Sequence, residues 1–132
     1  MIITLVNSIN EQHMNVLIID DSIAIARKLN ELISENKAVH ILGQAQSVRQ
    51  AIDMLGRLNP DVVFLDISLP DGSGMEVLIH IKKVKPEIKV IVFSNSANSF
   101  YQKKFTEQGS DYFLDKSKDF TKIPSIISSL VA

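Results

Sequence analysis

The fold of this 132-residue chain is decided by the stretch Val62-Val63-Phe64-Leu65-Asp66-Ile67-Ser68-Leu69-Pro70-Asp71-Gly72-Ser73-Gly74. Its first four residues form an apolar run, which is typical of a short strand buried in a parallel sheet. The loop after it is rich in proline, aspartate, glycine and serine, the residues that end strands. Asp66 therefore stands at a strand end, and we expect its carboxylate to be presented at the edge of a sheet.

A second apolar run, at residues 16–19, ends in the same way at Asp20 and Asp21. In one parallel sheet these acids and Asp66 would meet at the carboxyl edge, where open α/β sheets bind their ligands. Three carboxylates in one crevice repel each other and stay ionised together only beside a cation. A site of oxygen ligands with few protein groups suits Mg²⁺, which keeps several waters and usually bridges to a phosphate. The sequence therefore predicts phosphoryl chemistry.

Apolar runs and helical patterns alternate five times, which predicts an α/β fold with a doubly wound, five-stranded parallel sheet. We expect strands at 16–19, 40–44, 62–65, 90–93 and 112–114, and helices at 22–36, 47–58, 75–84, 99–108 and from 123 to the C-terminus. Ser47 and Gln50 have the spacing of a capping box, Gly109 stops the fourth helix, and Pro124 fits a first turn. We expect an N-terminal extension at 1–14 and one domain at 15–132.

Composition limits the partners and the compartment. The chain has 14 basic and 15 acidic residues, so no overall field steers it to nucleic acid or to an anionic membrane, and specific docking is the expectation. The chain has no cysteine, which excludes disulfides and thiolate ligands. The apolar run at 1–6 lacks a basic flank and is too short for a signal core or a membrane span, so we expect a cytoplasmic protein. His13, His40 and His80 have no ligand spacing and receive no metal role.

Two further strand ends carry polar groups to the same edge, Ser94 and Lys116. A carboxylate can act as the nucleophile that takes a phosphoryl group, a lysine and a metal can neutralise its oxygens, and a hydroxyl can donate to one of them. Simpler readings exist: Asp20 and Asp21 could begin a helix as solvated acids, and the mixed-charge run at 115–119 is usually surface. Because all these positions follow strands that end at the same edge of the sheet, we favour a functional site over these readings.

In this order and spacing, the residues resemble the receiver domain of bacterial two-component response regulators. The resemblance covers the chain from residue 15 and implies the flavodoxin-like (βα)₅ fold. By position, Asp66 resembles the phosphoacceptor, Asp21 the direct Mg²⁺ ligand, and Asp20 the acid that holds the metal through water. The other counterparts are the backbone carbonyl of Ser68 as a metal ligand, Ser94 as the switch hydroxyl, Lys116 as the lysine that contacts the phosphoryl group, and Phe113 as the switch aromatic.

The resemblance implies a phosphoacceptor and not an enzyme acting on a separate substrate. Its partners would be a histidine kinase or histidine phosphotransfer protein and a downstream protein, and a homodimer is compatible with this. The new charge would draw Ser94 inward and let Phe113 rotate. Ser117 replaces the family's usual proline, so we expect a trans peptide after Lys116. Ser68 and Ser96 would orient water poorly, so we expect a phosphoryl lifetime that is not unusually short.

Four alternatives remain open or are disfavoured. The chain could be the receiver part of a DNA-binding transcription regulator, against which an ending without a linker beyond Ala132 argues mildly; we expect no direct nucleic-acid contact from this chain. A phosphorylation-independent scaffold would not need competent chemistry at all five site positions. An aspartate-nucleophile phosphatase needs an acid where Ser68 stands. In a flavodoxin-like cofactor binder, Asp20 and Asp21 would repel the phosphate.

Overall fold

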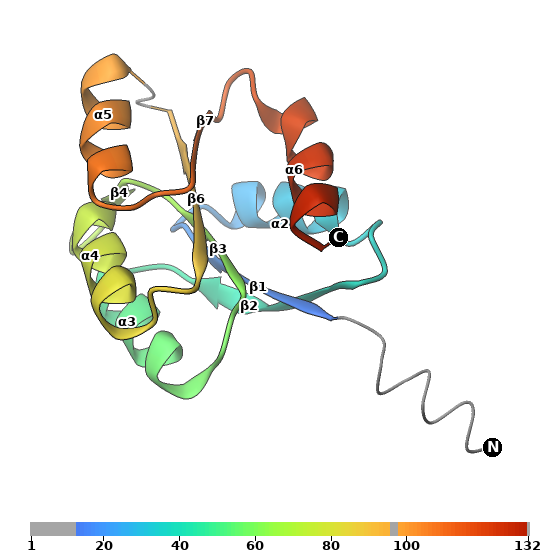
Figure 1. Ribbon diagram of the computed structural model, residues 1–132, viewed down its shortest axis with the longest axis horizontal. Coiled ribbons are helices and arrows are strands. Elements are labelled where there is room, and N and C mark those ends of the chain that lie inside the picture. Colours follow the sequence, from blue (N-terminus) through green and yellow to red (C-terminus); the bar gives the residue numbers. More distant parts are fainter. Residues whose placement is uncertain (1–12, 96–97, 132) are drawn as a thin grey trace.

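Five parallel strands form the central sheet in the computed structural model, which describes residues 13–95 and 98–131 (Figure 1). The spatial order is β2-β1-β3-β6-β7, and the strands are β1 (Met14–Ile19), β2 (Val39–Ala45), β3 (Val62–Leu65), β6 (Lys89–Ser94) and β7 (Tyr112–Asp115). The chain runs from β1 outward to β2 and then crosses to β3 on the other side of β1. The strand order thus reverses between β1 and β3, which is where ligand crevices form in such sheets.

Helices cover both faces of the sheet. They are α2 (Ile23–Ile33), α3 (Val48–Arg57), α4 (Gly74–Val84), α5 (Ser99–Glu107) and α6 (Ile123–Val131), the last preceded by a 3₁₀ turn at Phe120–Lys122. Figure 1 shows α3, α4 and α5 on one side of the sheet and α2 and α6 on the other. The predicted doubly wound architecture is confirmed.

The alternation of side chains along the strands divides the core into two layers. Leu17 and Ile19 of β1 pack with residues of α3, α4 and α5, whereas Val16 and Ile18 pack with residues of α2 and α6. The same alternation holds in β3, whose residues are all buried. Burial on both faces explains why residues 16–19 of β1 and all of β3 are continuous apolar runs.

The described elements differ from the predicted ones mainly at their ends. The first helix is shorter than the predicted 22–36, because Ser22 is its N-cap, with its hydroxyl accepting the N–H of Ile25, and Asn36 folds into a turn and accepts the N–H of Ala38. The first strand begins earlier, at Met14, which is buried in the core although it was expected to end the extension. Residues 1–12 of that extension lie outside the described residues.

The predicted capping box at Ser47 forms only in part. The Ser47 hydroxyl accepts the N–H of Gln50 at 3.0 Å, but the Gln50 side chain accepts the N–H of Gln46, one residue before the cap. A complete capping box instead begins α4, between Ser73 and Glu76. The same Ser-x-x-Glu spacing in the sequence was a signal for it.

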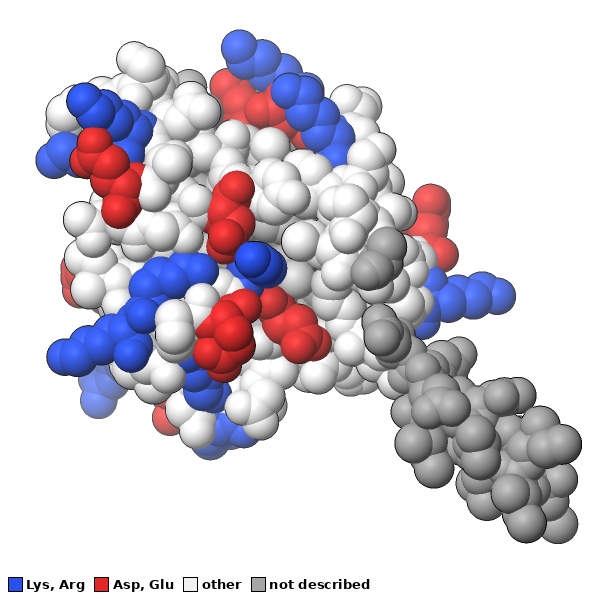
Figure 2. Space-filling model, viewed as in Figure 1, with Lys and Arg blue, Asp and Glu red and all other residues white. Residues whose placement is uncertain are grey.

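The surface agrees with the near-neutral composition. Basic and acidic side chains are interspersed on the face in Figure 2, with no large area of one sign. Within residues 13–95 and 98–131, no helix is both long and apolar enough to cross a bilayer.

Candidate functional site

The structure brings Asp20, Asp21 and Asp66 together at the carboxyl edge of the sheet. Each offers a carboxylate oxygen, and these oxygens lie within 4.8 Å of one another. The register of β1 and β3 explains this, because Ile19 pairs with Leu65 and the two strands therefore end at the same level. The strand-end reasoning predicted this convergence without any knowledge of the loops.

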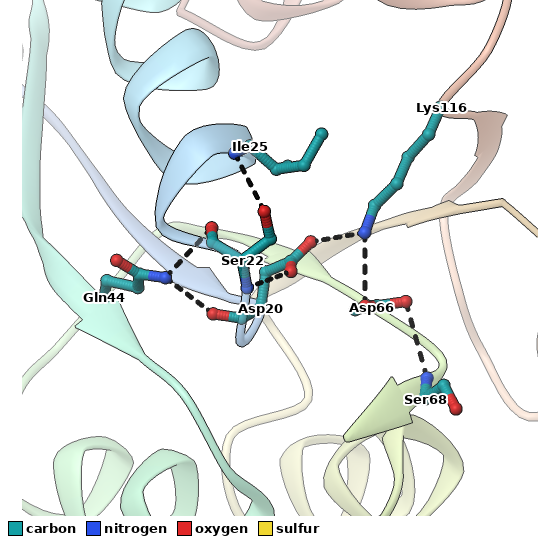
Figure 3. Close-up of polar contacts among 7 residues, drawn as sticks. All are labelled: Asp20, Ser22, Ile25, Gln44, Asp66, Ser68 and Lys116. Atoms are coloured by element: carbon teal, nitrogen blue, oxygen red, sulfur yellow. Dashed lines mark hydrogen bonds and ion pairs between the residues drawn. The ribbon is translucent and has the colours of Figure 1, made fainter. Parts of the chain in front are cut away.

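Lys116 reaches into the same group of acids (Figure 3). Its Nζ lies 2.6 Å from Oδ2 of Asp20 and 3.1 Å from Oδ2 of Asp66, and the lysine is buried. The backbone N–H of Lys116 donates to the carbonyl of Ser94 at 3.0 Å, which continues the pairing of β6 and β7 past its last residues. The charged run at 115–119 is therefore not simply solvated surface.

The cluster holds three carboxylates, and the ammonium of Lys116 pairs with two of them, Asp20 and Asp66, so the site has a formal excess of two negative charges. Burial, and then the charge of Asp20, raise the pKa of Asp66 above its usual value, although Lys116 acts in the opposite direction. Burial also opposes the charge on Lys116, but its hydrogen bond and ion pair with Asp20, joined by Asp66, prevail and raise its pKa. The positive charge of Lys116 therefore does not balance the negative charge of the three carboxylates.

This donor set fits a divalent cation. It consists of carboxylate oxygens, one of them exposed at Asp21 and two buried at Asp20 and Asp66, with no histidine or cysteine in the cluster. Hard oxygen ligands with one open side suit Mg²⁺, which keeps part of its water shell. The cation would also supply the positive charge that Lys116 alone does not.

The loop after Asp66 is fixed close to the acids. It forms a small antiparallel hairpin of β4 (Ser68–Leu69) and β5 (Gly72–Ser73), and the N–H of Ser68 faces Oδ1 of Asp66 at 3.4 Å. A side chain at Gly74 would collide with the backbone carbonyl of Asp66. Only glycine allows the start of α4 to approach the backbone of the candidate phosphoacceptor this closely.

Ser94 and Phe113 lie on the strands beyond β3. Ser94 ends β6, is buried, and is level with Asp115 of β7. Phe113 is half-buried and packs against Phe105 of α5, with ring centroids 6.0 Å apart. Phe113 thus belongs to the layer of α3, α4 and α5, whereas Tyr112 packs into the other layer. Ser96, which was expected together with Ser68 to orient water poorly, lies outside the described residues.

The peptide after Lys116 is trans, as expected, since the described part of the chain contains no cis peptide. Its geometry leaves the lysine side chain directed at Asp20 and Asp66. The role of each side chain in phosphoryl transfer stays a prediction.

Sequence reasoning missed two residues that hold the site loops. Asp71 belongs to the loop expected after Asp66, and its carboxylate accepts the N–H groups of Val48 at 2.7 Å and Arg49 at 3.1 Å, which ties this loop to the first turn of α3. These bonds lower the pKa of Asp71. Gln44 donates to the backbone around Asp21. Neither contact has a local sequence signal, because each joins segments more than 20 residues apart.

Comparisons with known proteins agree with this geometry. Residues 16–128 match the family model described as the response regulator receiver domain. The sensory transduction protein LytT of Bacillus cereus is 35% identical over 101 residues, which are 76% of this chain and 41% of LytT. A protein-glutamate methylesterase/protein-glutamine glutaminase of Treponema pallidum is 35% identical over 88 residues, 67% of this chain and 22% of that protein. The chain thus spans less than half the length of either relative.

Solved structures share the fold. The isolated REC domain of RcsB from Salmonella enterica serovar Typhimurium, with the phosphomimetic BeF₃⁻, has a TM-score of 0.84 at 22% identity, covering 90% of this chain and 88% of that one. The response regulator domain of Thermotoga maritima CheB has a TM-score of 0.77 at 25% identity, covering 90% and 94%. Since the family match extends from β1 into α6, the chain belongs to the response regulator receiver domains of two-component signal transduction.

Proposed function

We propose that Asp66 accepts a phosphoryl group from a histidine kinase or histidine phosphotransfer protein, with Mg²⁺ bound at Asp20, Asp21, Asp66 and the backbone carbonyl of Ser68. The observation that carries the proposal is a cluster of three carboxylates whose oxygens lie within 4.8 Å of one another, with one buried ammonium paired to two of them. An excess of negative charge is costly unless a ligand compensates it. A bound divalent cation would neutralise this charge and would reduce the repulsion of an incoming, negatively charged phosphoryl group.

The transfer needs an ionised nucleophile and a neutralised phosphoryl group. An oxygen of Asp66 attacks phosphorus, the bond from phosphorus to the donor nitrogen breaks, and the nitrogen keeps that electron pair while an acyl phosphate forms on Asp66. Mg²⁺, when bound, supplies positive charge for the phosphoryl oxygens. Lys116, already 3.1 Å from Asp66, is placed to turn its ammonium to one of them. Ser94 supplies the hydroxyl donor from the end of β6.

The signal would leave the site through β6 and β7. The carbonyl of Ser94 accepts the N–H of Lys116, so a displacement of one of these residues would strain the hydrogen bond and move the other. Phe113 lies three residues before Lys116 and packs on Phe105 of α5. We infer that the added charge repacks the surface of α5, β7 and α6, and that a downstream protein reads this change in the cytoplasm.

The names of the relatives do not extend the activity of this chain. The methylesterase relatives are matched over 21% to 31% of their length, so we propose that this chain acts as a phosphoacceptor and not as a methylesterase. It would act either by itself or as the receiver part of a longer regulator, as the 41% share of LytT allows.

The test is intact mass spectrometry after incubation with acetyl phosphate, with and without Mg²⁺. We expect one phosphoryl adduct on the native chain, dependent on Mg²⁺ and absent from Asp66→Asn. Asp111→Asn is the matched control, since Asp111 directly precedes β7, at the end of the sheet opposite the three acids, and accepts the N–H of Val90. An adduct that persists in Asp66→Asn would refute the assignment. So would a native chain that neither acetyl phosphate nor a phosphorylated histidine phosphotransfer domain can load.

A further inference from the structure

We propose that Gln44 is a positioning residue for Mg²⁺: its side-chain amide holds the backbone on both sides of Asp21 and thereby sets the affinity of the acidic turn for the cation. This inference rests on the proposed function, because it concerns the same metal site. Gln44 is on β2, a strand that contributes none of the acids.

The contacts are drawn in Figure 3. Nε2 of Gln44 donates to the carbonyl of Asp20 at 2.7 Å and to the carbonyl of Ser22 at 3.3 Å. These two carbonyls flank Asp21. The pairing of β1 with β2 reaches its last backbone bond where the N–H of Asp20 donates to Ala45 at 2.9 Å. The amide of Gln44 therefore extends the connection from β2 beyond the end of the ladder.

The turn needs this support because of its charge. Asp20 is buried and paired with Lys116, whereas Asp21 is exposed, so the position of the Asp21 carboxylate depends on the backbone beneath it. Adjacent carboxylates repel each other and favour a turn that opens. One bond within the turn resists this, from the N–H of Ser22 to Oδ1 of Asp20 at 2.8 Å. Gln44 adds two more from outside it.

A bulge in β2 aims Gln44 at the turn. Val16 pairs with Ile41 but Leu17 pairs with Gly43, so Leu42 is an extra residue in β2. A shift of one residue moves every later side chain to the opposite face, which places Gln44 level with Ile18 on the side of α2. Gly43, with φ of 154°, has a backbone conformation that favours glycine.

A neutral amide suits this task. It binds carbonyl oxygens, which a carboxylate would repel, and it does not offset the two excess negative charges that attract the cation. Gln44 thus orders the turn without competing for its ligand. Partners of metal-binding groups that orient them in this way typically change metal affinity when they are removed.

The test compares Gln44→Met, which keeps the length of the side chain but removes both donors, with Gln46→Met. The side chain of Gln46 makes no hydrogen bond to the described part of the chain, so this variant is the matched control. We expect Gln44→Met to raise the dissociation constant for Mg²⁺ roughly tenfold in isothermal titration calorimetry, and Gln46→Met to leave it near the native value. At saturating Mg²⁺, Gln44→Met should accept a phosphoryl group from acetyl phosphate at close to the native rate. A variant with a damaged phosphoacceptor site would react more slowly even at saturating Mg²⁺.

Equal Mg²⁺ affinities of Gln44→Met and the native chain would overturn the inference, and so would an equal loss in Gln46→Met. If the native chain binds no Mg²⁺ or forms no adduct, the proposed function fails; if it does both and Gln44→Met binds normally, only the role of Gln44 fails. A measurement on the native chain covers the case in which Gln44→Met does not fold. The side-chain amide resonances of Gln44 should shift with Mg²⁺ along the calorimetric binding curve, those of Gln46 should not, and an unshifted Gln44 amide would contradict the proposal.

Discussion

The two edges of the sheet both place lysine against aspartate, but in opposite proportions. At the amino edge, Asp111 lies 3.3 Å from Nζ of Lys82 and 3.9 Å from Nζ of Lys89, and it also accepts the N–H of Val90. Lys82 donates in addition to the carbonyl of Ile88 at 2.7 Å. At the carboxyl edge Lys116 pairs with Asp20 and Asp66, two of the three acids that cluster there.

The difference separates a structural ion pair from a binding site. At the amino edge, protein groups supply the partners of Asp111, so this acid needs no ligand to balance its charge. The carboxyl edge keeps an excess of negative charge that no described protein group removes, and this lowers the stability of the unliganded protein. The same residue types thus stabilise the fold at one edge and prepare a reaction at the other.

Replacing the lysine at each edge tests this contrast most strongly. Lys116→Met leaves Asp20 and Asp66 without a cation, and we expect a loss of about 3 kcal/mol of unfolding free energy without Mg²⁺, since it breaks a buried pair. We expect adduct formation to fall by about two orders of magnitude, because one electrostatic contact to the phosphoryl group is lost. Urea unfolding and intact mass measure the two effects.

Lys82→Met is the control at the amino edge. It should destabilise the chain but leave the rate of adduct formation at its native value, because Lys82 contacts Asp111 and local carbonyls only among the described residues. Equal loss of adduct in the two variants would mean that the edges do not differ as described.

Magnesium should stabilise the protein through the carboxyl edge. At a free concentration of 100 times its dissociation constant, we expect a gain of about 2.7 kcal/mol in unfolding free energy, reversed by EDTA. The gain should disappear in Asp21→Asn and persist in Asp111→Asn. Thermal unfolding with and without Mg²⁺ measures it, and a gain of the same size in Asp21→Asn would place the cation elsewhere.

Two aspartates of one loop should respond to pH with opposite signs. The pKa of Asp66 is raised in the folded state, mainly by burial, so its ionisation destabilises the fold as pH rises above the unfolded value near 3.8. We therefore expect Asp66→Asn to be more stable than the native chain at pH 7 without Mg²⁺. The advantage should shrink as pH falls through the raised pKa and vanish below 3.8.

Asp71 provides the opposite case. The N–H groups of Val48 and Arg49 lower its folded pKa, so its contribution is present above 3.8 and is lost as pH falls through that lowered pKa. Asp71→Asn should be less stable than the native chain at pH 7 and equal to it in strong acid. Urea titrations across pH measure both variants, and curves of the same sign would contradict the distinction.

The smallest expected effect concerns Ser110, beside Asp111. Its hydroxyl is buried and has no hydrogen-bond partner among the described residues, although its backbone N–H donates to Phe105. Ser110→Ala removes an unsatisfied polar group, so we expect a gain of about 1 kcal/mol in unfolding free energy. Mg²⁺ affinity should stay unchanged. A loss of stability would show that the hydroxyl has a role in the fold that its contacts do not explain.

The sequence predicts the acids better than their supports. Asp20, Asp21 and Asp66 converge because strand ends are visible as the ends of apolar runs, and parallel strands share an edge. Gln44 could not be found in this way, because its direction depends on a bulge that no local pattern announces. Aspartate is common in loops, so the sequence around Asp71 gave no reason to expect a further role. Its contact with α3 depends on tertiary packing. The Gln50 side chain bonds Gln46 instead of Ser47, a choice that the capping-box spacing leaves open.

The two-layer core has a consequence for how such a protein can diverge. Phe113 and Phe105 lie in the layer of α3, α4 and α5, and the sheet separates them from Tyr112 and from the layer of α2 and α6. Substitutions that remodel one layer therefore leave the packing of the other intact. After gene duplication, a copy can therefore change the helices of one layer while the helices of the other layer keep their packing on the sheet.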